Sequence, residues 1–203
     1  MPAPNQSMAL PKTEVRIDSD KFLVRTIEAD DASDRWASWM SDPEVRYMLN
    51  MAPRSWKKAD VVSYIDTFNQ GQNLLLGIFD KQSGTHVGIC TIDINPALGH
   101  FLLNLLIGEP DYRNKHVTTS IAESSLSYFF ETRGLNTAVA SVLAHNAPMI
   151  HWLRKNGWQL EQTRRQSAKS HADGTMLDVC LFSLRRESWR AWKQQALAQG
   201  DKR

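Results

Sequence analysis

A basic segment near the middle of the chain, IGEPDYRNKHVTTS (107–120), carries side chains well suited to chemistry. Its pattern predicts the end of a strand, a tight turn at 109–111, and then Arg113, Lys115 and His116 at the start of a helix. A helix N-terminus presents unpaired backbone N–H groups and a positive dipole end, and cationic side chains beside it strengthen an anion site. The segment therefore suggests phosphate binding. The alternative is that these basic residues only solvate the start of a helix.

Extended segments must position this loop. LLLGIF (74–79), VGICTIDI (87–94) and FLLNLLI (101–107) are apolar runs separated by short turns with Gly or Pro, the pattern of an antiparallel meander. The third run is apolar at nearly every position, which is typical of a central strand covered on both faces. An earlier strand is expected at Phe22–Ile27.

Helical periodicity surrounds these strands. Apolar residues recur at spacings of three and four within 33–49 and within 55–69, where Ser55 is the expected N-cap. A longer helix is expected at 114–132 and would end at Gly134. The rest of the chain predicts strands at 135–143, 158–163 and 176–184, a short helix at 147–156, and a last helix containing Trp189 and Trp192.

This order of elements predicts a mixed α/β fold of the α+β kind, with a mostly antiparallel central sheet flanked by helices. The strand at 101–107, the helix after it and the next strand should form a right-handed parallel unit, with a crevice at the carboxyl ends of the two strands. We expect a single domain over residues 21–198, between a flexible Pro-rich segment at 1–20 and a flexible tail at 199–203.

Composition narrows the classes of function. The 203 residues are 42% hydrophobic with a formal net charge of +2, which fits one folded domain and gives no strongly basic footprint for nucleic acid. No apolar run has the length of a membrane span or a signal peptide, so we expect a cytoplasmic protein, monomeric or homodimeric, without membrane or nucleic-acid partners. Cys90 and Cys180 lie in apolar runs and are expected to be buried reduced thiols, with no metal site.

Four segments, in sequence order, resemble GNAT-superfamily acyltransferases of the branch that includes ribosomal-protein N-terminal, spermidine and amino-sugar N-acetyltransferases. That branch's first strand and its Asp-Pro-Glu-Val helix turn are similar to LVRTIEADDA (23–32) and MSDPEVRYML (40–49). Its acyl-CoA loop resembles residues 107–120, and its NxxSxxxxEKxGF segment resembles HNAPMIHWLRKNGW (145–158). The resemblance implies the GNAT fold, in which two central parallel strands splay apart into a V-shaped cleft.

The resemblance also implies acetyl-CoA as the acyl donor, bound in that cleft. The pantetheine arm would pair with the first strand at Leu105, and the backbone N–H groups of Leu106 and Ile107 would stabilise the oxyanion. Asn146 would contact the pantetheine arm or hold the cleft open, and Lys155 would approach the phosphates. The pyrophosphate would rest on the loop residues Arg113, Asn114, Lys115, His116, Val117 and Thr118.

The implied reaction is direct attack of a primary amine, on a small molecule, an amino sugar or a protein N-terminus, on the thioester. A base must remove a proton, because an ammonium group of pKa near 10 leaves only about one free amine in a thousand at neutral pH. Glu109, at the strand end, is the first candidate, with Asp93 and His145 as alternates. Tyr112, His145 and His151 are the nearest candidate acids for the departing thiolate, and solvent can also serve as the acid. In this fold the acceptor would lie between residues 30–69 and the last hairpin.

Two departures from the family pattern leave an alternative open. The family's loop glycines fall at Asn114, His116 and Thr118, so His116 either adds a donor to the phosphate site or blocks it. The usual Ser or Tyr acid is replaced by Met149 or Leu153, neither of which donates a useful proton. The alternative to an acetyltransferase is a non-catalytic GNAT-fold binding module, or an enzyme that uses another acyl-CoA or an acyl carrier.

Overall fold

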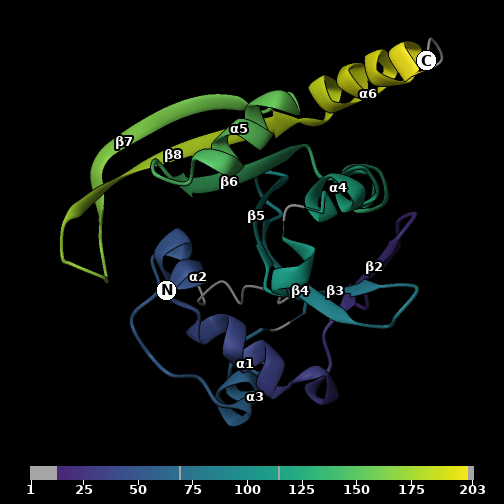
Figure 1. The fold of residues 1–203 in the computed structure, drawn as a ribbon. Helices are drawn as coiled ribbons and strands as arrows, with labels where there is room; N and C mark the ends of the chain where they lie inside the picture. The colour runs from purple at the N-terminus through teal and green to yellow at the C-terminus, as the bar shows by residue number, and fades with distance from the viewer. Residues whose placement is uncertain (1–12, 69, 114, 201–203) are drawn as a thin grey trace, which may run out of the picture.

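The computed structural model describes residues 13–68, 70–113 and 115–200 (Figure 1). The strands are β1 (Arg16–Asp18), β2 (Phe22–Thr26), β3 (Asn73–Asp80), β4 (His86–Asn95), β5 (His100–Ile107), β6 (Thr137–Leu143), β7 (Gln159–Lys169) and β8 (Met176–Arg185). The helices are α1 (Asp34–Ser41), α2 (Pro43–Leu49), α3 (Lys58–Ile65), α4 (Val117–Ser127), α5 (Ala147–Lys155) and α6 (Arg186–Gly200). Shorter segments are the 3-10 turns η1 (Ala29–Asp31) and η2 (Pro110–Tyr112) and the π-helical η3 (Tyr128–Thr132).

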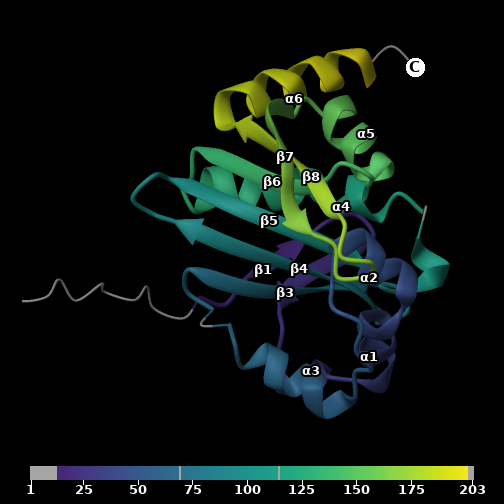
Figure 2. The same ribbon diagram turned by 90° about the vertical axis from the view of Figure 1, so that its left-hand side faces the viewer.

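The eight strands form one sheet in the order β1-β2-β3-β4-β5-β6-β8-β7. β5 and β6 run parallel, and the other neighbouring strands of the described chain run antiparallel. This arrangement confirms the expected mixed, mostly antiparallel sheet with a parallel unit around the helix after β5. Figures 1 and 2 show α1 and α3 on one side of the sheet and α4 on the other.

Two groups of buried apolar side chains cover the two faces of the sheet. Strand alternation divides neighbouring residues between them, so that Leu76 of β3 faces α4 and Leu75 faces α1–α3. On the α4 side, Phe101 of β5 stacks on Phe129, with ring centroids 5.0 Å apart. On the other side, Trp36 of α1 is fully buried. The central strands are therefore covered on both faces, as their apolar sequences predict.

The parallel strands stay paired only at their start. The register joins His100 to Thr137, Phe101 to Ala138 and Leu102 to Val139, and no pairing of β5 with β6 follows. β6 continues to pair with β8 through Leu143, while β5 pairs with β4 through Ile107. The β5 edge at 103–107 is thus left without a neighbouring strand on its β6 side, and the two strands separate toward their carboxyl ends.

Several boundaries differ from the sequence-based expectations. Ordered structure begins before residue 21, because Val15 and Ile17 are buried and β1 pairs with β2; residues 1–12 lie outside the described part of the chain. α3 begins at Lys58 and not near Ser55, because the Asp60 carboxylate accepts a hydrogen bond from the Lys57 N–H (2.8 Å). At the other end, α6 is described through Gly200.

β7 is longer than expected, running to Lys169 and not ending at residue 163. Its side chains are almost all exposed, so no alternation of apolar and polar residues marks it in the sequence. Backbone pairing with β8, interrupted between Arg164 and Ala168, holds it in the sheet. None of the helices in the described ranges is long and apolar enough to cross a membrane.

Candidate functional site

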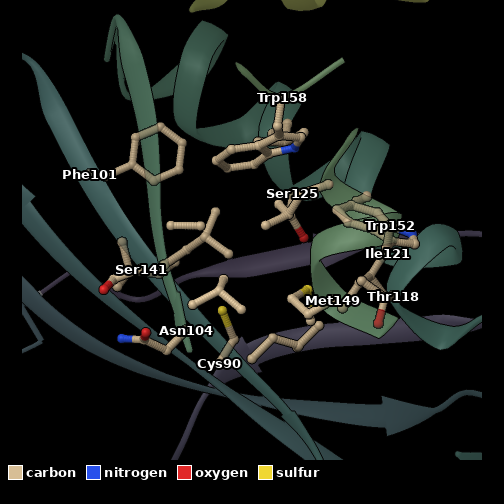
Figure 3. A pocket seen from close by; sticks show the side chains of 18 of the residues that line it. Cys90, Phe101, Asn104, Thr118, Ile121, Ser125, Ser141, Met149, Trp152 and Trp158 are labelled. Atoms are coloured by element: carbon tan, nitrogen blue, oxygen red, sulfur yellow. The ribbon is translucent and has the colours of Figure 1, made fainter. Parts of the chain in front are cut away.

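A cavity of about 190 Å³ lies where β5 and β6 separate, bounded by α4 and α5 (Figure 3). Apolar side chains such as Phe101, Ile121 and Trp158 form most of its wall. Its polar lining residues are Asn104, Thr118, Ser125, Ser141 and Asn146, together with the thiol of Cys90. No Asp, Glu, Lys, Arg or His is among the described residues that line it. We call this space the large cavity.

The start of α4 lies beside the large cavity, which Thr118 lines. The Val117, Thr118 and Thr119 N–H groups meet no acceptor among the described residues, and His116 gives α4 no side-chain cap. Trp152 of α5 donates to the Thr119 hydroxyl (3.0 Å), which fixes α5 against this end of α4. The helix therefore presents N–H donors that no described residue accepts next to an apolar cavity, an arrangement that suits an anionic ligand with a neutral tail.

His116 has the left-handed backbone conformation that glycine adopts readily, at the position where the family pattern has glycine. Its φ of 58° is left-handed, and its side chain is exposed. The His116 carbonyl accepts the Ser120 N–H (2.9 Å), so the first turn of α4 is formed. The imidazole does not line the large cavity. The loop backbone at residue 116 therefore has the conformation expected for glycine, although the residue is a histidine.

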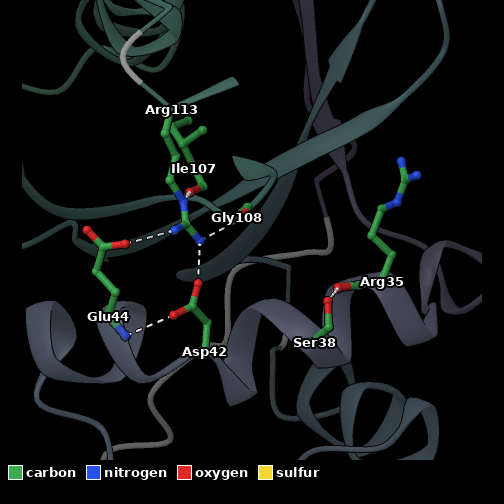
Figure 4. A network of polar contacts seen from close by, with 7 residues as sticks. All are labelled: Arg35, Ser38, Asp42, Glu44, Ile107, Gly108 and Arg113. Atoms are coloured by element: carbon green, nitrogen blue, oxygen red, sulfur yellow. Dashed lines mark hydrogen bonds and ion pairs between the residues drawn. The ribbon is translucent and has the colours of Figure 1, made fainter. Parts of the chain in front are cut away.

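Arg113 points away from the start of α4 and toward α2 (Figure 4). Its guanidinium donates to the carboxylates of Asp42 (2.8 Å) and Glu44 (3.1 Å) and to the Gly108 carbonyl (3.0 Å). Asp42 also caps α2 by accepting the Glu44 N–H (2.8 Å), and the hydrogen bond from Arg113 holds the pKa of Asp42 below its usual value. The Arg113 side chain connects the loop to α2, and its donors are already engaged.

The other residues expected at the donor site are dispersed. Leu105, Thr118 and Asn146 line the large cavity, and Asn146 caps α5 by accepting the Met149 N–H (3.3 Å). Lys155 is in the last turn of α5, about 13 Å along the helix from Asn146. Residues that do not line the cavity are Leu106, Ile107, Arg113, Lys115, His116, Val117 and Lys155. Asn114 lies outside the described residues.

Four of the five acid–base candidates line neither the large cavity nor a second, smaller one. Glu109 faces α1, where Arg35 Nε is 3.5 Å from its carboxylate. Asp93 accepts a hydrogen bond from Asn73 and pairs with Leu102, about 17 Å along the sheet from the end of β5. Tyr112 packs edge-on against the Phe22 ring, with centroids 6.3 Å apart.

The fifth candidate, His145, lines this second cavity of about 70 Å³, which we call the small cavity. Its ring stacks on Tyr47 of α2 (centroids 4.4 Å apart), and its Nε2 is 3.2 Å from the Tyr47 carbonyl. The small cavity lies between α2 and the turn of the β7–β8 hairpin, within the region expected to hold the acceptor. Its lining residues are Arg46, Tyr47, Asn50, Met51, Pro53, His145, Ser170, Ala172 and Leu177.

Asn50 holds the hairpin against α2, and sequence reasoning did not single it out. It ends α2 in the left-handed conformation (φ 50°), and its amide donates to the Lys169 carbonyl and accepts the His171 N–H, both at 2.9 Å. These partners are about 120 positions away in the sequence, so no local pattern indicates the contact. An Asn after a helix predicts a C-cap only.

Both cysteines are free thiols. Cys180 is buried as expected, whereas Cys90 is only partly buried and lines the large cavity. Removal from bulk water raises the pKa of the Cys90 thiol to about 12. In the described part of the chain, no group of three or more His, Cys, Asp or Glu side chains is placed to hold a metal ion.

Residues 21–159 match the family model of the acetyltransferase (GNAT) domain. The chain belongs to the GNAT acetyltransferase family. Members of this family are N-acetyltransferases that use acetyl-CoA, and the match covers β2 through the start of β7, including the large cavity. The sequence of this acetyltransferase has no match among curated proteins.

Solved structures share the fold of this GNAT acetyltransferase at low sequence identity. A GCN5-related N-acetyltransferase from Brucella melitensis has a TM-score of 0.76 at 20% identity, covering 95% of this chain and 89% of that one. The spermidine N-acetyltransferase from Vibrio cholerae, in complex with CoA and spermine, gives 0.73 at 14%, covering 83% and 98%. The ribosomal-protein-S5-alanine acetyltransferase from Vibrio fischeri gives 0.67 at 15%, covering 86% and 98%.

Proposed function

We propose that this GNAT acetyltransferase moves the acetyl group of acetyl-CoA to a primary amine. Three adjoining features carry the proposal: the N–H groups of α4 that no described residue accepts, the large cavity beside them, and the β5 edge along that cavity that no described strand pairs with. Acetyl-CoA has a diphosphate, a chain with two amides, and a thioester. Each feature suits one of these parts.

The residues present fit this donor in chemical terms. The N–H groups of residues 117–119 would bind a diphosphate, helped by the dipole of α4. The β5 edge would hydrogen-bond the amides of an extended chain, as an added strand does. The apolar wall would exclude water from the thioester. Acetyl-CoA supplies the activated acetyl group, and the chain's own groups position it and handle protons.

His145 is the base that the geometry favours over Glu109. In the neutral ring Nε2–H donates to the Tyr47 carbonyl, so Nδ1 keeps the lone pair that accepts a proton. Glu109 is directed at Arg35, outside both cavities. The Cys90 thiol stays protonated because burial raises its pKa to about 12. The leaving group departs as a thiolate, which a thiol of pKa about 8.5 allows, and it would take a proton from solvent once CoA leaves the cavity.

Calorimetric titration with acetyl-CoA and an assay of amine-dependent thiol release test this proposal. Thr118→Glu places a carboxylate beside the N–H groups at the start of α4 and should abolish acetyl-CoA binding by repelling the diphosphate. Thr67→Glu, at an exposed position after α3, is the matched control and should bind like the wild type. His145→Gln should lower the rate of thiol release with binding retained. Wild-type protein that binds no acetyl-CoA would refute the proposal.

A further inference from the structure

We infer that the acceptor amine is carried by an anionic molecule, and that Arg46 in the small cavity binds its carboxylate or phosphate group. This rests on the proposed function, because it names the class of molecule that receives the acetyl group. The inference depends on three observations. Arg46 is half-buried and has no partner among the described residues, no carboxylate is in the described lining of either cavity, and the small cavity lies beside the large one.

Arg46 is a half-buried cation whose side chain has no ion pair and no hydrogen bond among the described residues. Its Nε is buried without a partner. By contrast, Arg25, Arg113 and Arg190 each donate to a carboxylate. Arg133 and Arg186 also have a buried side-chain nitrogen without a partner, but neither lines the large or the small cavity. A guanidinium that is partly removed from water and left unpaired costs free energy, which an anionic ligand recovers through charge-assisted hydrogen bonds.

Carboxylates on α2 and on the β7–β8 hairpin, the elements that flank the small cavity, are engaged elsewhere. Asp42 and Glu44, on the same helix, both accept from Arg113. Asp173, in the turn of the β7–β8 hairpin, accepts from the Thr175 hydroxyl and N–H. Neither cavity has an Asp or Glu among the described residues that line it. A polycationic acceptor would find no counter-charge there, whereas an anion finds Arg46.

The small and large cavities adjoin along two elements. α2 contributes Tyr47 to the small cavity and the next residue, Met48, to the large one. The turn between β6 and α5 contributes His145 to the small cavity and Asn146 to the large one. An acceptor whose anionic group lies at Arg46 therefore has its other end directed past His145 toward the splay of β5 and β6, where the thioester would lie.

The structure assigns Arg46 a role in specificity, which matched amines can test. Thiol release from acetyl-CoA is measured with ethanolamine against phosphoethanolamine, glucosamine against glucosamine 6-phosphate, and a short peptide amide against its free acid. Spermidine is the polycation. The anionic member of at least one pair should show a kcat/KM tenfold or more above its neutral partner. The phosphate and peptide arms show which anion is preferred.

Arg46→Gln should remove that preference, lowering kcat/KM for the anionic amine about tenfold and leaving the neutral amine unchanged. Arg16→Gln removes one positive charge at an exposed position of β1, outside both cavities, and as the matched control it should keep the preference. The Arg46 side chain makes no hydrogen bond in the described structure, so Arg46→Gln should fold with an unchanged Tm. Equal turnover of neutral and anionic amines, a preference for spermidine, or an intact preference in Arg46→Gln would each overturn the inference.

A binding measurement separates this inference from the proposed function. Calorimetry with phosphoethanolamine and with the peptide acid, without any acyl donor, reports the anion site alone. Binding by the wild type and its loss in Arg46→Gln support the site, and binding equal in both proteins, or absent from the wild type, refutes it. If the wild type binds no acetyl-CoA, the proposed function fails, and this titration still decides for or against the anion site.

Discussion

Replacing Arg113 with methionine tests whether this residue holds the loop or binds phosphate. The change removes hydrogen bonds to Asp42, Glu44 and the Gly108 carbonyl. The Arg113 and Asp42 side chains are 24% and 27% exposed, so this pair is intermediate between two classes of ion pair. Surface pairs stabilise a protein by about 0–1 kcal/mol, and buried hydrogen bonds to charged groups by about 1.5–3 kcal/mol. We expect a loss of about 2 kcal/mol in unfolding free energy, which for a chain of this length lowers Tm by about 4–8 °C.

The assay combines thermal unfolding with acetyl-CoA titration of Arg113→Met, Asp42→Asn and the double variant. Asp42→Asn removes the carboxylate charge but keeps an oxygen that caps α2. Because Asp42 and Arg113 contact each other, their effects on stability should overlap, with a coupling of about 1 kcal/mol. Arg190→Met breaks a two-hydrogen-bond pair with Glu131 that is more exposed, and as the control it should cost less stability than Arg113→Met.

Whether Asp42→Asn weakens or strengthens acetyl-CoA binding decides between the two roles of Arg113. If the pair holds the loop, both Asp42→Asn and Arg113→Met weaken acetyl-CoA binding. If Arg113 binds phosphate, Asp42→Asn releases the guanidinium from its carboxylate and strengthens binding, while Arg113→Met weakens it. Tighter acetyl-CoA binding by Asp42→Asn would therefore refute the assignment of Arg113 to holding the loop.

Three further predictions concern a cap, a buried histidine and the loop. Asn146→Ala should cost about 1 kcal/mol of stability by removing the α5 cap, and Asn146→Asp should retain it, as thermal unfolding will show. Burial lowers the pKa of His86 to about 4. The unfolded chain, with a histidine pKa near 6.5, binds more protons, so unfolding free energy should fall by up to about 1.4 kcal/mol per pH unit from pH 6.5 to 4. His86→Phe should flatten this slope in denaturant titrations at several pH values. His116→Gly should change stability by less than about 1 kcal/mol, because glycine adopts φ 58° freely, and calorimetry should find acetyl-CoA affinity unchanged or improved.

The sequence contains most of the fold because its signals are local. The meander appears in three apolar runs with Gly- or Pro-bearing turns, and α2 in Asp42-Pro43, a capping residue followed by proline at the first helical position. The second half of β7, after residue 163, was not predicted because its exposed side chains carry no alternation. β1 escaped because three paired residues in a polar context give no periodicity to detect.

The candidate site was less predictable, because its geometry depends on contacts between distant segments. Sequence reasoning found the donor loop and placed His145 among the candidates for catalysis. It predicted that Arg113 binds the pyrophosphate, whereas in the structure this side chain donates to carboxylates about 70 positions earlier in the chain. The sequence gives no reason to single out Arg46, since no local pattern distinguishes an unpaired arginine in a short helix from a solvated one.

Helix α2 physically connects the two halves of the candidate site. Its first turn is capped by Asp42, which also receives Arg113 from the donor loop. Its later residues, Arg46 and Tyr47, line the small cavity. These residues span little more than one helical turn, so a displacement of the donor loop that pulls on Asp42 also moves the groups that would hold the acceptor. The absence of glycine from this loop, residues 109–118, then has a structural counterpart. Its shape is maintained by a left-handed histidine and by the connection to α2, and the loop position is thereby linked to the acceptor side of the enzyme.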